Sequence, residues 1–144
     1  MTATDVQNSQ LLAANITSLM SAPVLTAYQD ESLWEAWQLM YVAGLRHLAI
    51  LQSDGRCVGV LSDRMVVAAG GWDEEGLRMR QISELAGRMS PVKLDAQCSV
   101  ADAATALTDR RVEAALVIER ERLVGIVTET DLVRWLARSD RPGA

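Results

Sequence analysis

Few side chains in this sequence could take part in chemistry. There is one histidine, His47, and there are two cysteines, Cys57 and Cys98. The cysteines form no C-x-x-C motif and have no nearby histidine partner, which argues against a zinc site and against a Cys-His nucleophile pair. The chain also lacks a P-loop and a G-x-S-x-G motif, and its acids are scattered. We therefore expect no catalysis, no metal, and two structural thiols in a reducing cytoplasm.

A hydroxyl and a carboxylate stand three residues apart at one predicted helix start. Thr128 follows a Gly and two hydrophobic residues and precedes Asp131. Earlier in the chain, Ser62 also follows a Gly and two hydrophobic residues, but Met65 stands three residues after it. Ser or Thr at such a position can cap a helix, and the N-terminus of a helix favours anions. The same local structure is thus expected twice, with the carboxylate present in only one copy.

Composition and charge exclude several classes of protein. The chain has 144 residues, a length that suffices for one compact domain or for two small repeats. Of these residues 49% are hydrophobic, which is ordinary for a globular protein. Its net charge of -5 opposes nucleic-acid binding, because a phosphate backbone needs a basic face. No run reaches the roughly 18 apolar residues that a membrane helix needs, and no signal peptide is evident. We therefore expect a cytoplasmic protein that binds neither nucleic acid nor membrane.

The two helix starts belong to a longer internal repeat. The offset between the copies falls from 69 to 66 residues along the chain. The gaps that account for this fall lie where loops are expected. The first copy contains Met20-Ser21-Ala22-Pro23-Val24, Ser32–Ala36 and Arg56–Ser62, which resemble Met89-Ser90-Pro91-Val92, Ser99–Ala103 and Arg122–Thr128 of the second.

Each copy predicts the element order strand, helix, strand, strand, helix, which makes the fold class α+β. Apolar residues at i, i+3, i+4 and i+7 indicate the first helix of each copy, with Ser32 and Ser99 either as N-caps or just inside the first turn. Asp54-Gly55 is typical of a hairpin turn. The expected strands are 24–26, 45–51, 56–62, 92–94, 112–119 and 122–128, and the expected closing helices are 63–69 and 129–137.

The repeats divide the chain into five parts. We expect a leading helix or tail over 1–15, a first repeat over 16–69, a linker over 70–81, a second repeat over 82–137 and a tail over 138–144. A single repeat of about 55 residues buries too little surface to be comfortable alone. Two repeats that pack through their sheets solve this problem.

This pattern resembles the CBS-domain family, and the resemblance covers about residues 16–137. The segments that carry it are Gly125-Ile126-Val127-Thr128-Glu129-Thr130-Asp131-Leu132 and Gly59-Val60-Leu61-Ser62-Asp63-Arg64-Met65. The resemblance implies a pair of CBS repeats with pseudo-twofold symmetry and two clefts between the repeats, where adenosine nucleotides bind in many members. It further implies that the Asp accepts hydrogen bonds from the ribose, while the Ser or Thr and the helix N-terminus contact the phosphate.

Carried onto this chain, the resemblance implies one complete cleft. The residues assigned to it are Met20, Val24, Leu25, Leu45, Arg46, His47, Ile126, Thr128 and Asp131. Each polar residue also has a plain structural interpretation. Asp131 can serve the helix dipole, Thr128 can be a cap, Arg46 can form a surface ion pair and His47 can be a structural histidine.

The second cleft is expected to be degenerate. Its residues are Val60, Ser62, Met65, Lys93, Val112, Glu113 and Ala114. Met65 replaces the ribose acceptor, and Glu113 stands where Arg46 stands in the first cleft. A carboxylate there would repel phosphate by about 1 kcal/mol or more. We expect this cleft to be empty or to bind something other than a phosphorylated nucleotide, although a one-residue shift of the helix start could bring in Asp63 as an acceptor.

These expectations lead to a regulatory function without a required cofactor. The first hypothesis is a sensor of AMP, ADP, ATP or a related adenosine ligand that signals to an effector protein, and the alternative is a ligand-free dimerisation or scaffold module. Such modules commonly form homodimers, and Trp135 and Leu136 are the candidates for that contact.

Overall fold

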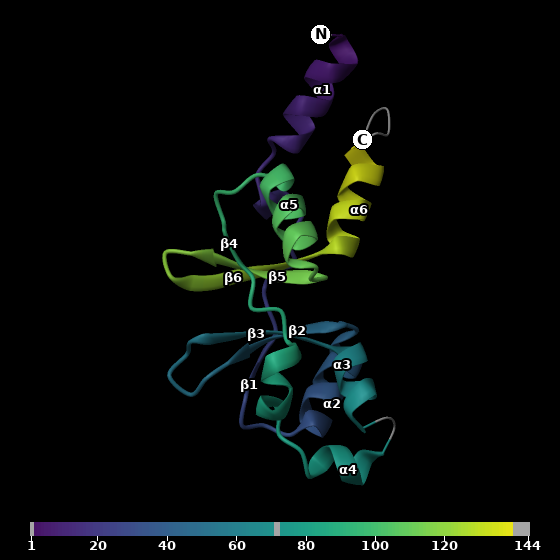
Figure 1. Ribbon diagram of the computed structural model, residues 1–144, viewed down its shortest axis with the longest axis vertical. Coiled ribbons are helices and arrows are strands. Elements are labelled where there is room, and N and C mark those ends of the chain that lie inside the picture. Colours follow the sequence, from purple (N-terminus) through teal and green to yellow (C-terminus); the bar gives the residue numbers. More distant parts are fainter. Residues whose placement is uncertain (1, 71–72, 140–144) are drawn as a thin grey trace. The chain divides into compact units, whose positions relative to one another are not determined.

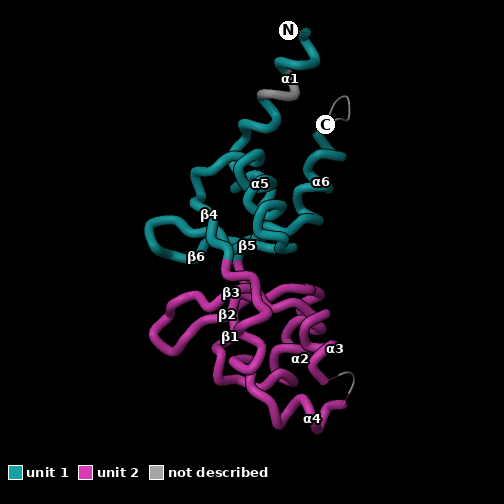
Figure 2. The backbone as a smooth tube through the Cα atoms, viewed as in Figure 1, with its two compact units in different colours: residues 1–23, 92–144 teal, residues 24–91 magenta. Residues whose placement is uncertain are grey.

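The computed structural model describes residues 2–70 and 73–139, and they form two compact units. Unit 1 contains residues 1–23 and 92–144, and unit 2 contains residues 24–91, as Figure 2 shows in two colours. Residues 1, 71–72 and 140–144 lie outside the described residues. Trp72 and most of the expected tail over 138–144 are therefore not described.

Unit 2 has a three-stranded sheet in the order β1-β2-β3. Strands β1 and β2 are parallel, and β2 and β3 are antiparallel. Helices α2 and α3 lie on one face of this sheet (Figure 1). The elements of the unit are β1 (Thr26–Tyr28), α2 (Leu33–Ala43), β2 (His47–Leu51), β3 (Cys57–Ser62), α3 (Asp63–Gly70), α4 (Glu74–Arg78) and the 3-10 segment η2 (Ile82–Arg88).

Unit 1 repeats this plan. Its sheet has the order β4-β5-β6, with β4 and β5 parallel and β5 and β6 antiparallel. Helices α5 and α6 lie against it (Figure 1). The elements are α1 (Ala3–Leu12), the 3-10 segment η1 (Ile16–Ser18), β4 (Lys93–Asp95), α5 (Val100–Arg110), β5 (Ala114–Glu119), β6 (Arg122–Thr128) and α6 (Glu129–Ser139). The element order predicted for each repeat is confirmed.

The central helix of each repeat starts at a capping serine and ends at a residue with left-handed backbone. The backbone N–H of Glu35 donates to Ser32 Oγ at 3.1 Å, and the N–H of Asp102 donates to Ser99 Oγ at 3.1 Å. Both serines therefore cap their helices, as predicted. The helices end on residues in the left-handed region, Gly44 with φ 67° in unit 2 and Arg111 with φ 53° in unit 1. Glycine adopts this conformation without strain, whereas arginine does not.

Each unit has its own hydrophobic core. Apolar faces of α2 and of the central strand β2 meet in unit 2, where Leu33, Met40, Leu48 and Ile50 are among the buried residues. The equivalent core of unit 1 includes Val100, Leu107, Ala115, Val117 and Val127. Trp34 and Trp37 pack against the first core and Trp135 against the second, each partly buried. These three tryptophans thus extend the two cores toward the surface of their units.

The units exchange their leading segments. Residues 16–23 begin the first repeat in sequence but belong to unit 1, where Ile16 is fully buried. Residues 82–91 begin the second repeat but belong to unit 2, where Ile82, Leu85 and Met89 join the core. Each sequence repeat therefore gives its leading segment to the core of the other unit.

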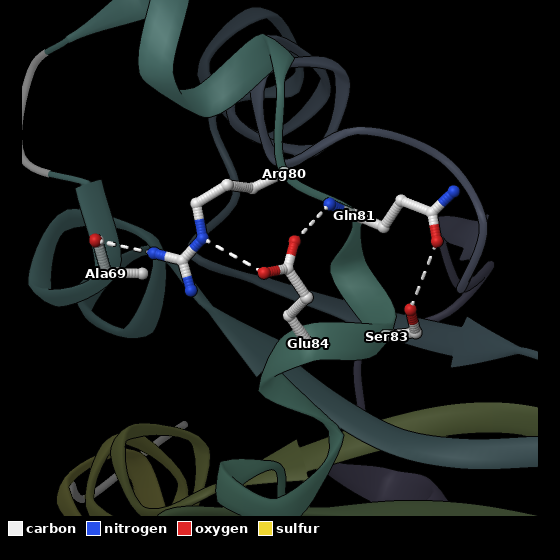
Figure 3. Close-up of polar contacts among 5 residues, drawn as sticks. All are labelled: Ala69, Arg80, Gln81, Ser83 and Glu84. Atoms are coloured by element: carbon white, nitrogen blue, oxygen red, sulfur yellow. Dashed lines mark hydrogen bonds and ion pairs between the residues drawn. The ribbon is translucent and has the colours of Figure 1, made fainter.

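The segment between α3 and η2 is fixed in unit 2 by one arginine. Arg80 Nη1 donates to the carbonyl oxygen of Ala69 at 2.7 Å, and Arg80 Nε lies 3.4 Å from Glu84 Oε1 (Figure 3). Glu84 Oε2 in turn accepts the backbone N–H of Gln81 at 2.7 Å, and Ser83 Oγ donates to Gln81 Oε1 at 3.4 Å. Glu84 thus connects the arginine to the start of η2.

Several expected bounds shift. Strand β1 begins at Thr26, two residues after the prediction, because the backbone pairing with β2 starts there. Strands β2 and β5 each begin two residues later than expected, at His47 and Ala114. The expected linker over 70–81 contains α4, whose Leu77 is buried, and residues 3–12 of the leading segment form α1. Helix α6 continues two residues further, to Ser139.

Candidate functional site

The end of β6 and the start of α6 hold the predicted hydroxyl and carboxylate. The backbone N–H of Asp131 donates to Thr128 Oγ1 at 3.1 Å, and the backbone N–H of Thr128 donates to Asp131 Oδ2 at 2.9 Å. This reciprocal pair is a capping box with Asp in the place of Glu. Both side chains are partly buried, so the carboxylate is held in one place at the positive end of the helix.

The equivalent corner of unit 2 has only half of this arrangement. The backbone N–H of Met65 donates to Ser62 Oγ at 3.3 Å, so Ser62 caps α3 as Thr128 caps α6. Met65 brings no acceptor and packs partly buried against the core of its unit. A group that binds by donating hydrogen bonds to a carboxylate can therefore use the Thr128 corner, and it has no acceptor from residue 65 at the Ser62 corner.

Arg46 lies beside the start of α3 and forms a surface ion pair. Its Nε donates to Asp63 Oδ2 at 3.3 Å, and its side chain is 66% exposed. The backbone N–H of Asp63 also donates to the carbonyl oxygen of Arg46 at 3.0 Å. The ion-pair interpretation left open by the sequence is therefore realised, and Asp63 is occupied as its partner. An exposed pair of this kind contributes about 0–1 kcal/mol, so Arg46 can exchange it for another anion at little cost.

In unit 1 the positions of this ion pair are taken by two acids. The backbone N–H of Glu129 donates to the carbonyl oxygen of Glu113 at 2.9 Å, just as Asp63 bonds Arg46. Glu113 and Glu129 are both exposed. The start of α6 thus carries no cation equivalent to Arg46, and the contrast between Arg46 and Glu113 that the sequence indicated lies at equivalent backbone positions.

Strand glycines allow the exchanged segments to approach. A Cβ atom on Gly59 of β3 would lie 2.7 Å from the backbone oxygen of Ser90, and a Cβ on Gly125 of β6 would lie 2.5 Å from Met20 Sδ. Backbone bridges join Ser90 to Val60 and Ser21 to Ile126 at the same places. These glycines therefore have a packing role that the sequence analysis missed, although their recurrence in both copies was a visible signal of it.

The residues predicted for the two clefts divide between the units. Of the first set, Met20, Ile126, Thr128 and Asp131 belong to unit 1, and Val24, Leu25, Leu45, Arg46 and His47 belong to unit 2. Of the second set, Val60, Ser62 and Met65 belong to unit 2, and Lys93, Val112, Glu113 and Ala114 belong to unit 1. Within unit 1, the Ser21–Ile126 bridge places Met20 near Ile126. The composite clefts stay predictions.

Other chemistry finds little support in the described residues. No group of three or more His, Cys, Asp or Glu side chains among residues 2–70 and 73–139 is arranged to hold a metal ion. Burial, with the nearby carboxylates of Asp102 and Asp95, raises the pKa of the Cys98 thiol above its ordinary value. Such a thiol is a poorer nucleophile at neutral pH. None of the described helices is long and apolar enough to cross a membrane.

Comparison with known proteins agrees with this architecture. The family model described as "CBS domain" matches residues 16–70 and 82–138. Hypoxic response protein 1 of Mycobacterium tuberculosis is 34% identical over 118 residues, which is 82% of this chain and 82% of that protein. An uncharacterized protein of Methanocaldococcus jannaschii is 25% identical over 133 residues, 85% of this chain and 32% of its own length.

Solved structures share the fold. A crystal structure of Hypoxic Response Protein I with two coordinated zinc ions is 31% identical and has a TM-score of 0.67 over 84% of this chain and 98% of that one. The CBS domain of a membrane protein from Sphaerobacter thermophilus has a TM-score of 0.79 at 17% identity, over 92% of this chain and 93% of that one.

A third solved structure contains adenosine compounds. The CBS domain pair of protein MJ0100, in complex with 5′-methylthioadenosine and S-adenosyl-L-methionine, has a TM-score of 0.70 at 21% identity over 89% of this chain and 99% of that one. Two matched repeats, a relative above 30% identity and the fold of two equivalent α+β units all agree. This chain therefore belongs to the CBS domain family, as a tandem pair.

Proposed function

We propose that this chain is a non-catalytic regulatory module that binds an adenosine-type nucleotide in one cleft and signals to an effector protein. The ligand is AMP, ADP, ATP or a related adenosine compound. The residues that bind it are Met20, Val24, Leu25, Leu45, Arg46, His47, Ile126, Thr128 and Asp131.

The observation that carries this proposal is the capping box at the start of α6. It holds the Asp131 carboxylate by one oxygen, Oδ2, while Oδ1 accepts no hydrogen bond from the described residues. A fixed carboxylate with an unused oxygen suits the vicinal hydroxyls of a ribose, because each hydroxyl needs an acceptor. The adenosine compounds bound by the related CBS pair of MJ0100 contain such a ribose, which supports the same class of ligand here.

The proposal assigns one ligand to each chain. Met65 supplies no acceptor in the equivalent corner of unit 2, and Glu113 replaces the cation Arg46 at the equivalent backbone position. The carboxylate of Glu113 would repel a phosphate by about 1 kcal/mol or more in a partly desolvated cleft. The cleft that contains Met65 and Glu113 is therefore empty of phosphorylated nucleotide in our proposal.

Thermal shift and calorimetry with AMP, ADP, ATP, NAD and S-adenosylmethionine test the proposal. A ligand at 100 times its Kd should raise the free energy of unfolding by about 2.7 kcal/mol, and calorimetry should give one site per chain. Asp131→Asn keeps a side-chain oxygen that can accept the Thr128 N–H but removes the charge, so it should abolish the ligand shift and change the ligand-free stability little.

The matched control is Asp102→Asn, which changes the first-turn acid of α5 and should leave the ligand shift intact. Two ligands per chain, or an undiminished shift in Asp131→Asn, would contradict the assignment of the site. If none of the five compounds shifts the melting temperature, the nucleotide proposal fails.

A ligand-free dimerisation module is the second candidate, and exposed apolar side chains favour it. Tyr41 and Val42 at the end of α2 are 79% and 82% exposed, and Val133 and Leu136 on α6 are 65% and 47% exposed. Large apolar groups at such exposure often mark an interaction surface. Trp135, in contrast, packs partly into the core of unit 1 and is less available for a partner than Leu136.

Light scattering on a sizing column tests this candidate. A homodimer should double the apparent mass, and Leu136→Glu together with Val42→Glu should return the chain to a monomer without loss of its fold. A wild-type chain that stays monomeric at high concentration would remove the dimerisation module from consideration.

A further inference from the structure

The exposed side of α2 is more apolar than its place in the fold requires. The core residues of α2 have apolar counterparts in α5, and the two sets are Leu33, Ala36 and Met40, and Val100, Ala103 and Leu107. On the exposed side the two helices differ. Tyr41 and Val42 of α2 are 79% and 82% exposed. The equivalent residues of α5 are Thr108 and Asp109, so the same fold forms in unit 1 without apolar groups at these positions.

Aromatic side chains are concentrated on the same helix. The chain has four tryptophans, two tyrosines and no phenylalanine, and Trp34, Trp37 and Tyr41 all lie on α2. Their spacings of three and four residues place them along one flank of the helix. The equivalent residues of α5 are two alanines and a threonine. The aromatic flank therefore belongs to α2 alone and is not a feature of the repeat.

The part of α2 that a partner can reach combines this flank with polar residues. We call it the α2 face, and its residues are Trp34, Glu35, Gln38, Tyr41 and Val42. At 3.6 residues per turn they fall within about a third of the helix circumference. Trp34 is partly buried and the other residues of the face are exposed. Exposed apolar groups rimmed by polar ones mark interaction surfaces, and tryptophan and tyrosine are enriched where interfaces bind most strongly.

One end of the α2 face shows which chemistry covers its aromatic rings. Helix α4 packs against α2 (Figure 1), and the guanidinium carbon of Arg78 lies 5.4 Å from the centre of the Trp34 ring. Arg78 Nη2 donates to Glu74 Oε1 at 2.9 Å, so a carboxylate holds the cation that the ring attracts. Tyr41 lies about 10 Å further along the helix. Among residues 2–70 and 73–139, no cation lies over the Tyr41 ring.

The charge around the α2 face favours a basic partner. Glu35 is exposed on the face, and the start of α4 adds the exposed acids Asp73, Glu74 and Glu75. The last turn of α2 has no basic residue, whereas the last turn of α5 has Arg110. The C-terminus of a helix carries partial negative charge and favours a nearby cation. The last turn of α2, which presents Tyr41 and Val42, therefore has no basic side chain of its own to offset that charge.

We propose that the α2 face is the docking surface for a basic segment of the effector protein. An arginine of that segment lies over the Tyr41 ring, as Arg78 lies over Trp34, and an apolar residue covers Val42. Glu35 attracts the neighbouring basic residues. That the partner is the effector rests on the proposed function. A second copy that met this face with its own α2 face would bring the Glu35 carboxylates together, which like-charge repulsion opposes.

A synthetic peptide tests this surface on the full chain without any nucleotide. In the peptide arginine alternates with leucine and both ends are blocked, and a counterpart has glutamate in place of every arginine. In NMR titrations the arginine peptide should shift the amide signals of Tyr41 and Val42. The signals of Thr108 and Asp109 in α5 should stay in place. The glutamate peptide should shift neither pair, and added salt should weaken the arginine peptide.

Tyrosine substitutions test the ring. Tyr41→Thr introduces the residue type that α5 has at the equivalent position, so the fold should be kept. It should weaken the arginine peptide about fivefold, because an exposed cation–π contact is lost, whereas Tyr41→Phe should keep the affinity. The matched control is Tyr28→Thr, which removes the other tyrosine, 46% exposed on β1 of the same unit, and should leave the affinity unchanged.

A second pair of variants tests the charge. Glu35→Gln should weaken the arginine peptide about twofold to threefold, because an exposed ion pair contributes little more than that. Asp102→Asn at the equivalent position of α5 changes the net charge of the chain by the same amount and should have no effect. Equal weakening by the two variants would show that net charge, and not the α2 face, attracts the peptide.

Three results of the peptide titrations would overturn the docking surface: no binding of the arginine peptide, equal binding of the glutamate peptide, or an undiminished affinity in Tyr41→Thr. A wild-type dimer that Tyr41→Thr disperses would also overturn it, because a second copy then covers the face. The nucleotide titrations are separate from this test. If the arginine peptide binds at Tyr41 while no adenosine compound binds, the nucleotide proposal fails and the docking surface stands.

Discussion

At the scale of single residues, the repeat provides internal controls, because equivalent positions carry different side chains on the same backbone. Thr128 with Asp131 and Ser62 with Met65 share one capping geometry and differ in the carboxylate. A second such pair is Gly44 and Arg111, which end α2 and α5 in the left-handed region. Differences within these pairs can be assigned to the side chain and not to the fold.

Arg111→Gly should stabilise the chain. Left-handed backbone costs an L-residue about 1–2 kcal/mol, and glycine avoids it at a smaller entropic cost, so we expect a gain of about 0.5–1 kcal/mol in the free energy of unfolding. Urea denaturation measures it. Gly44→Ala is the counterpart and should lose about 1 kcal/mol, since the space beside Gly44 is open and only its φ angle is unfavourable for alanine. A loss of stability in Arg111→Gly would contradict the argument.

Cys98 should react slowly with thiol reagents in the folded protein. Burial and the carboxylates of Asp102 and Asp95 raise its pKa, so the thiolate fraction at pH 8 is smaller than in the unfolded chain. In a Cys57→Ser background, the rate with a disulfide reagent should rise when the protein is unfolded in urea. A folded-state rate equal to the unfolded one would show that the raised pKa is wrong.

At the scale of elements, the strand glycines and the exchanged segments depend on one another. Gly59 in β3 receives the backbone of Ser90, and Gly125 in β6 receives the side chain of Met20 together with the backbone of Ser21. Close approach of another segment of the same chain therefore explains why glycine stands at positions 59 and 125, without reference to a ligand. The hydroxyl and carboxylate that follow it are what remain for binding.

Alanine at these two glycines should have unequal effects. In Gly59→Ala the new Cβ would lie 2.7 Å from the backbone oxygen of Ser90, which cannot turn aside as the end of a side chain can, so we expect a loss of about 1–3 kcal/mol. In Gly125→Ala the nearest atom is Met20 Sδ at 2.5 Å, the end of a flexible side chain, so the loss should be smaller. Thermal unfolding of both variants makes the comparison, and a larger loss in Gly125→Ala would show that Met20 cannot move aside.

At the scale of the whole molecule, the compact units differ from the sequence repeats. Unit 2 runs from residue 24 to 91 without interruption, whereas unit 1 is assembled from residues 1–23 and 92–144. The exchange means that a repeat cut out by its sequence boundaries loses part of its core. Residues 16–69 would lack Ile82, Leu85 and Met89, and would keep Ile16 without the residues of unit 1 that bury it.

A fragment of residues 24–91 should therefore fold better than one of residues 16–69. The first fragment contains every residue of the unit 2 core, whereas the second lacks the core residues that follow residue 69. The second fragment also exposes Ile16, which is buried in unit 1. Circular dichroism and the dispersion of amide signals in NMR compare the two. A cooperative thermal transition in 16–69 and none in 24–91 would show that the repeat, and not the compact unit, is the folding unit.

Local patterns account for what the sequence by itself determined. The internal repeat, the element order, the caps Ser32 and Ser99 and the unequal pair Asp131 and Met65 all follow from residues a few positions apart, where periodicity and capping chemistry act. From the sequence, Arg46 can belong to the cleft or form a surface ion pair, and its spacing of 17 residues from Asp63 gives no reason to prefer the ion pair that forms.

Contacts between distant residues decided the rest. Only the tertiary structure shows that residues 16–23 complete the core of unit 1 and that residues 82–91 complete the core of unit 2, because the burial of Ile16 and Met89 depends on partners far along the chain.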